Sequence, residues 1–250
     1  MNEHATLRVR APAGARLALV ALLGLTAASV GTAAAAAPSA LPARVRPSQQ
    51  LVSLLRPQQA MSGPSERSAR VRLVASRRPL TGVRTTLPVV GQQTRQGLRW
   101  LLVRLPGRPN GRTAWIRGAG TVSSTSRWQI LVDRSSRRVT VYSSGRPVRS
   151  FRAIVGKPST PTPRGGFFVE EVIQLRSSDV GAPYALALSA RSDVLQEFDG
   201  GPGQIGLHGL MNIGGVLGSA VSHGCVRLPN EAIRWLVFRI SPGVPVTITR

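Results

Sequence analysis

Short apolar runs, separated by turns rich in glycine and proline, recur along most of the chain from residue 70 to residue 250. They include Trp128–Asp133, Arg138–Tyr142 and Phe167–Ile173. Short runs of this kind, rich in valine, isoleucine and leucine, are typical of β-strands. The chain also holds 26 glycines and 19 prolines, which favours many turns over a helical bundle. The sequence therefore predicts a mostly β protein with one or two short helices.

The best helix candidate begins at Asn230. Apolar residues recur there with the i, i+3, i+4, i+7 spacing of a single helical face: Ile233, Leu236, Val237 and Ile240. Asparagine is favoured at helix starts because its side chain accepts a hydrogen bond from a free backbone N–H. We therefore expect Asn230 to cap this helix.

The first 37 residues have the three parts of a secretory signal peptide. Arginines at positions 8, 10 and 16 precede an apolar run over 17–30, and a small-residue tract over 33–37 offers cleavage points. We predict that residues 1–37 direct export to an extracytoplasmic compartment. The leader is also long enough to span a bilayer, so it would act as a membrane anchor if it stayed uncleaved.

Three further segments are distinguished by composition. Residues 38–66 are rich in proline, serine, glutamine and arginine, and we predict a linker there. Residues 67–118 hold strand-like runs and an Asn-Gly turn between Arg108 and Arg112, which indicates a hairpin. This segment resembles a small SH3-like β-barrel, either a docking module or a spacer that packs on the next domain. We predict a domain boundary at residues 118–126, before a second β domain over 127–250.

Cys225 is the only cysteine of the chain, and two of the three histidines, His208 and His223, lie within 17 residues of it. A lone cysteine cannot form an intrachain disulfide, and a thiol beside an imidazole is a strong nucleophile. The backbone amides of Gly224 and Cys225 are candidate donors to an oxyanion. His208 ends a predicted strand, so its imidazole is expected at a sheet edge. The pattern favours acyl transfer through a thiolate.

A zinc site is the main alternative for the same residues. One cysteine and two histidines form a thin ligand set, because structural zinc sites usually take four protein ligands. An inert buried cysteine is the other alternative, and its glycine and histidine neighbours argue against it. We expect no metal and no other cofactor.

The residues His208-Gly209, a twelve-residue gap and Ser222-His-Gly-Cys-Val-Arg-Leu228 resemble the signature of the L,D-transpeptidases with a YkuD-type catalytic domain. These bacterial enzymes cross-link peptidoglycan or attach proteins to it. The resemblance covers about residues 127–250 and implies a YkuD-like β-sandwich. It also implies that Cys225 is the nucleophile and that His208 is the base, oriented by the carbonyl of Gly209.

The same resemblance implies roles around these two groups. His223, the second imidazole of the catalytic set, and Gly224 would shape the oxyanion hole and the pocket. Ser222 and Arg227 would support the loop or bind substrate carboxylates. Tyr184 would line the donor pocket.

The implied reaction has two half-reactions on peptidoglycan stem peptides. The thiolate attacks a donor tetrapeptide stem at its L-centre residue and releases D-alanine. An amine of an acceptor stem then resolves the thioester and forms a 3–3 cross-link. Members of this family also tend to be acylated by carbapenems. A cysteine hydrolase (an L,D-carboxypeptidase) acting on the same stems and a non-catalytic wall-binding protein stay open as alternatives.

The formal net charge of +23 indicates polyanionic surroundings. Residues 38–126 alone hold 15 arginines and one acidic residue. Anionic wall polymers and phospholipid headgroups are the simplest partners for such a surface. Nucleic acid is disfavoured, because the chain has a secretory leader and lacks a recognised nucleic-acid-reading motif.

Overall fold

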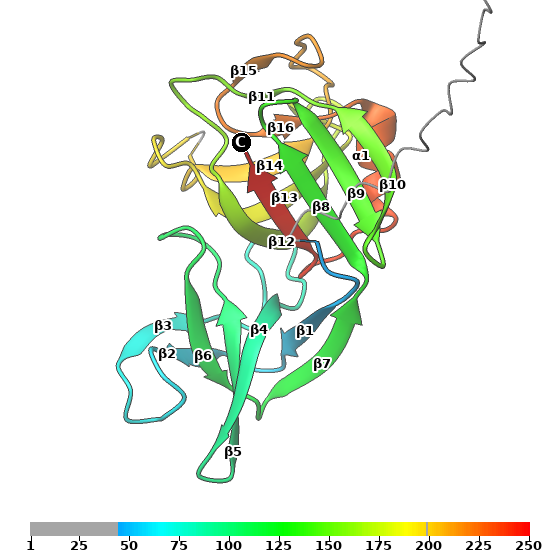
Figure 1. Ribbon diagram of the computed structural model, residues 1–250. Helices are drawn as coiled ribbons and strands as arrows, with labels where there is room; N and C mark the ends of the chain where they lie inside the picture. The colour runs from blue at the N-terminus through cyan, green and yellow to red at the C-terminus, as the bar shows by residue number, and fades with distance from the viewer. Residues whose placement is uncertain (1–44, 199) are drawn as a thin grey trace, which may run out of the picture. The chain divides into compact units, whose positions relative to one another are not determined.

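The computed structural model describes residues 45–198 and 200–250. The predicted signal peptide and residues 38–44 of the predicted linker lie outside these residues. The described chain is mostly β, as predicted, with two large sheets, a two-stranded sheet and one α-helix (Figure 1). Among the described residues, no helix is both long and apolar enough to cross a membrane.

The first sheet has seven strands in the order β3-β2-β6-β5-β4-β1-β7. Its strands are β1 (Gln49–Leu54), β2 (Gln58–Met61), β3 (Arg70–Val74), β4 (Thr86–Arg95), β5 (Leu98–Arg104), β6 (Thr113–Arg117) and β7 (Thr121–Ser126). The predicted hairpin around the Asn-Gly turn is confirmed, since β5 and β6 pair antiparallel on either side of it. The SH3-like identity of this unit stays a prediction.

The prediction of a linker over residues 38–66 is wrong from Gln49 onward. β1 and β2 both lie in that segment and both belong to the seven-stranded sheet. Leu51, Val52 and Leu54 are buried among the glutamines and serines that suggested a linker. Gln58 is also buried, and its side-chain amide donates to the carbonyl of Ala119 at 2.8 Å. The polar composition of this segment therefore gave no sign of its strands, because their buried apolar residues are few.

The predicted domain boundary at residues 118–126 also contains a strand, β7. β7 pairs with β1 along its whole length, from Gln49 opposite Ser126 to Leu54 opposite Thr121. Most side chains of β7 are exposed or half-buried serines and threonines, and backbone hydrogen bonds to β1 hold the strand. The first unit therefore runs from the beginning of the described chain to Ser126.

The second sheet has eight strands in the order β10-β9-β8-β17-β12-β13-β14-β16. Its strands are β8 (Trp128–Asp133), β9 (Arg138–Ser143), β10 (Arg146–Arg152), β12 (Gly165–Gln174), β13 (Tyr184–Arg191), β14 (Gln204–His208), β16 (Val226–Arg227) and β17 (Pro245–Thr249). The small sheet pairs β11 (Val155–Gly156) with β15 (Ala220–Ser222) in parallel.

The predicted helix is present as α1 (Asn230–Val237), with Ile233 and Leu236 buried. The prediction that Asn230 caps it is wrong, because the N-cap residue is Pro229 and makes no side-chain hydrogen bond. Asn230 instead accepts a hydrogen bond through Oδ1 from the amide of Leu210 at 2.8 Å. Its side chain thus fixes the segment that follows His208.

Strand β12 contributes to two hydrophobic cores. Phe167 packs in the core of the second sheet, and the next residue, Phe168, packs in the core of the first. Because neighbouring side chains of a strand point to opposite faces, these two residues can serve both cores at once. The two sheets therefore share apolar surface, and the second unit is not independent of the first.

Candidate active site

The residues of the predicted catalytic motif meet where β14 and β16 lie side by side. The two strands are parallel neighbours, with Leu207 opposite Val226 and His208 opposite Arg227. Leu207 and Val226 are fully buried in the core. Because side chains alternate along a strand, His208, Arg227 and Cys225 share the other face. The register thus brings the thiol and the imidazole to the same side of the sheet edge.

This face opens into a cavity of about 510 Å³. Cys225, His208, His223, Ser222 and Arg227 all line it. The remaining wall is formed by β14 itself and by residues from other segments: Val180, Ser192, Leu195, Phe198, Gly203, Gln204, Ile205 and Ile213. A half-buried thiol therefore faces an enclosed space with an imidazole and a guanidinium around it.

The imidazole of His208 is held by the backbone. Its Nδ1 lies 2.8 Å from the carbonyl oxygen of Gly209. A carbonyl can only accept, so Nδ1 carries the proton and Nε2 keeps its lone pair. Burial lowers the pKa of His208, an effect to which the nearby charge of Arg227 adds and which the Gly209 contact partly offsets. His208 is therefore neutral at pH 7 and able to accept a proton through Nε2.

Two glycines near this ring occupy positions that leave no space for a side chain. Gly181 has a φ of +83°, and a β-carbon placed there would overlap Nδ1 of His208. A β-carbon at Gly209 would collide with the carbonyl oxygen of Ala182 and lie 2.8 Å from Oδ1 of Asn230. Gly181 thus makes room for the imidazole itself, and Gly209 makes room for the backbone that holds it.

The thiol of Cys225 is protonated in the resting protein. Burial raises its pKa, while a hydrogen bond from the amide of Gly206 and the charge of Arg227 act in the opposite direction. Its sulfur lies 4.0 Å from the carbonyl oxygen of Gln204, a group without net charge. A raised thiol pKa beside a lowered imidazole pKa favours a neutral pair over a thiolate–imidazolium pair. Such a thiol needs a base during the reaction.

Ser222 and Gly224 shape the turn that carries Cys225. The buried Ser222 hydroxyl donates to the carbonyl of Cys225 at 2.6 Å and accepts from the amide of Gly224 at 3.1 Å. Gly224 has a φ of +124°, and a β-carbon there would lie 2.9 Å from Cδ1 of Ile205. Ser222 therefore supports the loop. The expectation that the Gly224 amide is an oxyanion donor is corrected, since Ser222 already occupies that N–H.

A second support for this turn comes from the proline-rich loop after β11. The Thr162 hydroxyl donates to the carbonyl of Gly224 at 2.8 Å and accepts from the amide of Gly156 at 2.9 Å. Thr160 donates to the carbonyl of Ser222 at 3.3 Å. Nothing local in the sequence of this loop shows that it contacts residues about 60 positions away.

Arg227 is buried in the cavity wall, at 9% exposure. One terminal nitrogen donates to the carbonyl of Gly214 at 3.3 Å. Its Nε is buried and has no hydrogen-bond partner within the described part of the chain. A buried guanidinium N–H without a partner is costly, so this group is suited to an anionic oxygen that enters the cavity.

The other two predicted pocket residues differ in position. His223 is exposed and stacks on Phe198, with ring centroids 5.4 Å apart, so it lies at the rim of the cavity. Tyr184 is half-buried at the start of β13 and packs against the core of the second sheet. It is not among the described residues that line the Cys225 cavity. The structure therefore does not bring Tyr184 into this pocket, because its strand position directs it to the core.

Sequence reasoning missed Leu195, Phe198 and Gly203, which follow β13 and form one side of the cavity. They belong to no periodic pattern, and only the glycine carries a local signal. Among the described residues, no group of three or more histidine, cysteine, aspartate or glutamate side chains is placed to hold a metal ion.

A neutral thiol and a backbone-held imidazole lie on one face of a β-sheet edge, which is the arrangement that nucleophilic catalysis by a cysteine requires. Residues 127–248 match the family model of the YkuD L,D-transpeptidase catalytic domain. This part of the chain belongs to that family, as the sequence motif predicts.

Two relatives show the extent of the similarity. A Bacillus licheniformis protein named L,D-transpeptidase YkuD is 33% identical over 125 residues, which cover 49% of this chain and 66% of the relative. L,D-transpeptidase 1 of Mycobacterium tuberculosis is 28% identical over 126 residues, which cover 46% of this chain and 47% of the relative. The similarity thus spans less than two thirds of either relative.

Solved structures are similar over a larger part of the chain. An L,D-transpeptidase from Mycobacterium smegmatis is 20% identical, covers 66% of this chain and 99% of its own, and has a TM-score of 0.38. An L,D-transpeptidase from Mycobacterium tuberculosis H37Rv is 16% identical, covers 79% and 96%, and has a TM-score of 0.44.

Proposed function

We propose that this protein is an exported peptidoglycan L,D-transpeptidase that works through a Cys225 thioester. One observation carries the proposal: His208, with Nδ1 held by the Gly209 carbonyl, and Cys225 line one cavity on the same face of the sheet edge. The membership of residues 127–248 in the YkuD family supports the same reaction.

The first half-reaction forms the thioester. Nε2 of His208 takes the thiol proton as the sulfur of Cys225 attacks the donor carbonyl, at the L-centre residue of the stem. The bond between that carbonyl carbon and the nitrogen of D-alanine then breaks. The imidazolium returns its proton to the departing amine, so D-alanine leaves and His208 is neutral again.

The second half-reaction transfers the acyl group. An amine of an acceptor stem attacks the thioester carbonyl and forms an amide bond as the carbon–sulfur bond breaks. His208 takes a proton from the amine and returns it to the sulfur. The unpartnered Nε of Arg227 would hold a stem carboxylate during these steps. No net redox change or energy source is required.

The leader over 1–37 and the high positive charge support export to an anionic cell wall. Outside the cysteine cavity, four arginines line a groove of about 820 Å³: Arg134, Arg137, Arg164 and Arg250. Anionic wall polymers are the partners that such a groove would attract. A membrane would be a partner only through an uncleaved leader.

The test is mass spectrometry of purified tetrapeptide muropeptides after incubation with the protein. Cross-linked dimers with release of D-alanine are expected, and tripeptides alone would indicate the hydrolase instead. Cys225→Ala should form neither product and should not be labelled by a carbapenem. A wild-type protein that is neither labelled nor active on any stem would favour the non-catalytic wall-binding alternative.

A further inference from the structure

We propose that the β5–β6 loop of the first sheet, residues 105–112, is a structural part of the active site and that Arg108 is its positioning residue. Arg108 holds the segment after β13 in place as a wall of the Cys225 cavity. The proposal deepens the transpeptidase function above and rests on it for the identity of the substrate. It assigns to the first unit a role in substrate binding in addition to any role in docking.

The segment concerned follows β13 and leads into β14. Its residues Ser192, Leu195, Phe198 and Gly203 line the same cavity as Cys225. It has little regular structure, and its few internal hydrogen bonds include those from the amides of Val194 and Leu195 to the Ser192 hydroxyl. These bonds order the beginning of the segment, and the amide of Ser192 donates to the carbonyl of Gly203 at 2.8 Å, which joins its two ends. The path of the chain between these ends depends on other contacts.

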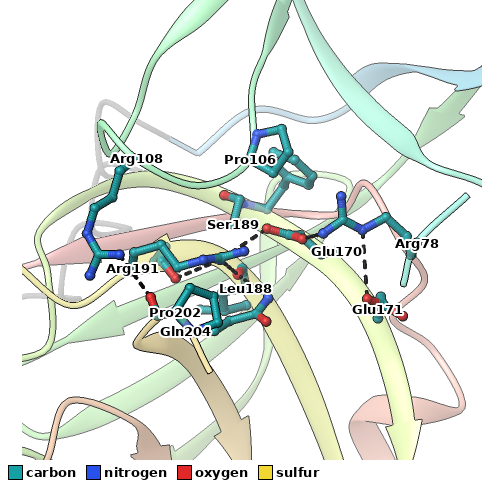
Figure 2. A network of polar contacts seen from close by, with 12 residues as sticks. Arg78, Pro106, Arg108, Glu170, Glu171, Leu188, Ser189, Arg191, Pro202 and Gln204 are labelled. Carbon is teal, nitrogen blue, oxygen red and sulfur yellow. Dashed lines mark hydrogen bonds and ion pairs between the residues drawn. The ribbon is translucent and has the colours of Figure 1, made fainter. Parts of the chain in front are cut away.

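Arg108 supplies contacts at both ends of this segment. Its guanidinium donates to the carbonyls of Ser192 at 2.7 Å, Leu195 at 2.8 Å and Pro202 at 2.9 Å. These carbonyls are 84 to 94 positions away in the sequence. Figure 2 shows the side chain of Arg108 reaching toward Pro202 beside Arg191. A planar guanidinium has five donors in a fixed arrangement on three nitrogens, so it can bind carbonyls that are spaced more widely than those around the single nitrogen of a lysine.

The loop that carries Arg108 is itself fixed. Arg72 on β3 donates to the carbonyls of Pro106 at 2.7 Å and of Arg108 at 2.8 Å. The amide of Gly107 donates to the carbonyl of Ser189 on β13 at 3.0 Å. Arg108 therefore projects from a loop that is tied both to its own sheet and to the strand that precedes the cavity segment.

Asn110 strengthens this junction at the end of β13. Its side-chain amide donates to the carbonyl of Arg191 at 2.7 Å, and its Oδ1 accepts from the Arg191 amide at 2.9 Å. The same amide group also donates to Asp193 Oδ1 at 2.9 Å. The side chain thus pairs with the strand as a neighbouring backbone would, and it fixes where the cavity segment begins.

A buried ionic cluster lies beside the loop and makes the junction rigid. Glu170 on β12 is 1% exposed and forms ion pairs with Arg78 of the first unit and Arg191 of the second (Figure 2). The neighbouring Glu171 accepts from the amide and the hydroxyl of Thr81 at 2.8 and 2.7 Å. Buried charges with several partners tolerate little relative movement, because each displacement leaves a charge unpaired.

These contacts predict a specific defect when Arg108 is removed. The cavity segment would lose the three bonds from Arg108 and keep those from Asn110, whereas Cys225, His208 and their backbone supports would keep all of theirs. Binding of a bulky stem peptide should weaken more than the intrinsic reactivity of the thiol. Because a misplacement of about 1 Å in a site can cost on the order of 100-fold, we expect at least a tenfold rise in KM.

The experiment compares Arg108→Ala and Arg108→Lys with Arg112→Ala in the full chain. Arg112 lies in the same loop and is exposed, so its variant loses the same charge without losing a contact to the segment. Three quantities are measured: hydrogen exchange of the amides in 192–198, kcat and KM for a tetrapeptide donor, and the rate of Cys225 alkylation by iodoacetamide.

For Arg108→Ala we expect faster exchange in 192–198, a KM at least about tenfold higher and a kcat and alkylation rate within about threefold of wild type. The exchange rate and KM of Arg108→Lys should lie between those of wild type and Arg108→Ala. All measured values of Arg112→Ala should match wild type. Unchanged exchange in both Arg108 variants, or an equal effect in Arg112→Ala, would overturn the proposal. If Arg108→Ala does not fold, Arg108→Lys decides by the same criteria. If the wild type processes no stem peptide, the transpeptidase function fails, and hydrogen exchange alone still decides the role of Arg108.

Discussion

Replacing Gly181 with alanine tests whether the position of the His208 ring sets the rate of acyl transfer. Gly181 has a φ of +83°, its amide donates to Met211 and its carbonyl accepts from Gly209, both at 2.8 Å. A methyl group at this position would overlap Nδ1 of His208 and lie 2.9 Å from Cγ. Carbon atoms in contact prefer about 3.5–4.0 Å, so the ring would have to retreat by roughly 0.6–1 Å.

The magnitude of the effect follows from this displacement. A shift of about 1 Å in a catalytic group costs on the order of 100-fold, and we expect a loss of that size in the acylation rate of Cys225. The left-handed backbone costs an alanine about 1–2 kcal/mol of stability. For a chain of this size, such a loss lowers Tm by about 2–8 °C, so the variant should still be folded at 25 °C.

Gly97→Ala is the matched control. Gly97 has a φ of +71° in the turn between β4 and β5, and within the described chain a β-carbon there meets no atom within 4 Å. It should lose similar stability and keep the wild-type acylation rate. The rate is measured by intact-protein mass spectrometry of the carbapenem adduct over time, with Tm from thermal unfolding. Wild-type acylation by Gly181→Ala, or an equal loss in both variants, would refute the assignment of His208 as the positioned base.

Three further predictions concern the same site. His208→Ala should lower the acylation rate more than Arg227→Ala, because only His208 accepts the thiol proton; similar rates in a carbapenem labelling assay would place the base elsewhere. Since the pKa of His208 is lowered from 6.5 and that of Cys225 is raised from 9.0, the base stays neutral and the thiol protonated between these values. The pH profile of kcat/KM for acylation should therefore be flat there and fall on the acid side with a midpoint below 6.5; a midpoint above 6.5 would contradict the lowered pKa. Ser222→Ala should cost about 1–3 kcal/mol in chemical denaturation, because it leaves the Gly224 amide and the Cys225 carbonyl without their partner. Ser219→Ala is the control, since the Ser219 hydroxyl has no hydrogen-bond partner in the described residues, and an equal loss in both variants would argue against a supporting role for Ser222.

The core of the site could be predicted because its parts are local in sequence. Cys225 lies within a short motif, and His208 ends a strand whose alternating burial is visible in the residues around it. The cavity wall could not be predicted in the same way. Leu195 and Phe198 belong to an irregular segment, and their placement depends on Arg108, a residue about 90 positions away. Such a contact leaves no periodicity or spacing in a single sequence.

Two of the wrong predictions about the fold have a similar cause. β7 is rich in serine and threonine, so its composition suggests a boundary, whereas backbone pairing with β1 makes it a strand. Asn230 has the residue type of a helix cap, but the amide of Leu210 competes for its side chain. Local preference is overridden in both cases by a partner from elsewhere in the chain.

These long-range contacts also bear on what the first unit does. A docking module alone would need only a surface and a linker to the catalytic domain. Instead, Phe168 of the catalytic sheet is buried in the core of the first unit, and Glu170 is paired with Arg78 across the junction. Exposing an apolar ring and a buried carboxylate would be costly, so the junction is part of the fold and not a passive contact. The first unit thus packs on the catalytic domain in the way that the spacer alternative describes, and the role proposed for Arg108 at the wall of the cysteine cavity would add to this packing.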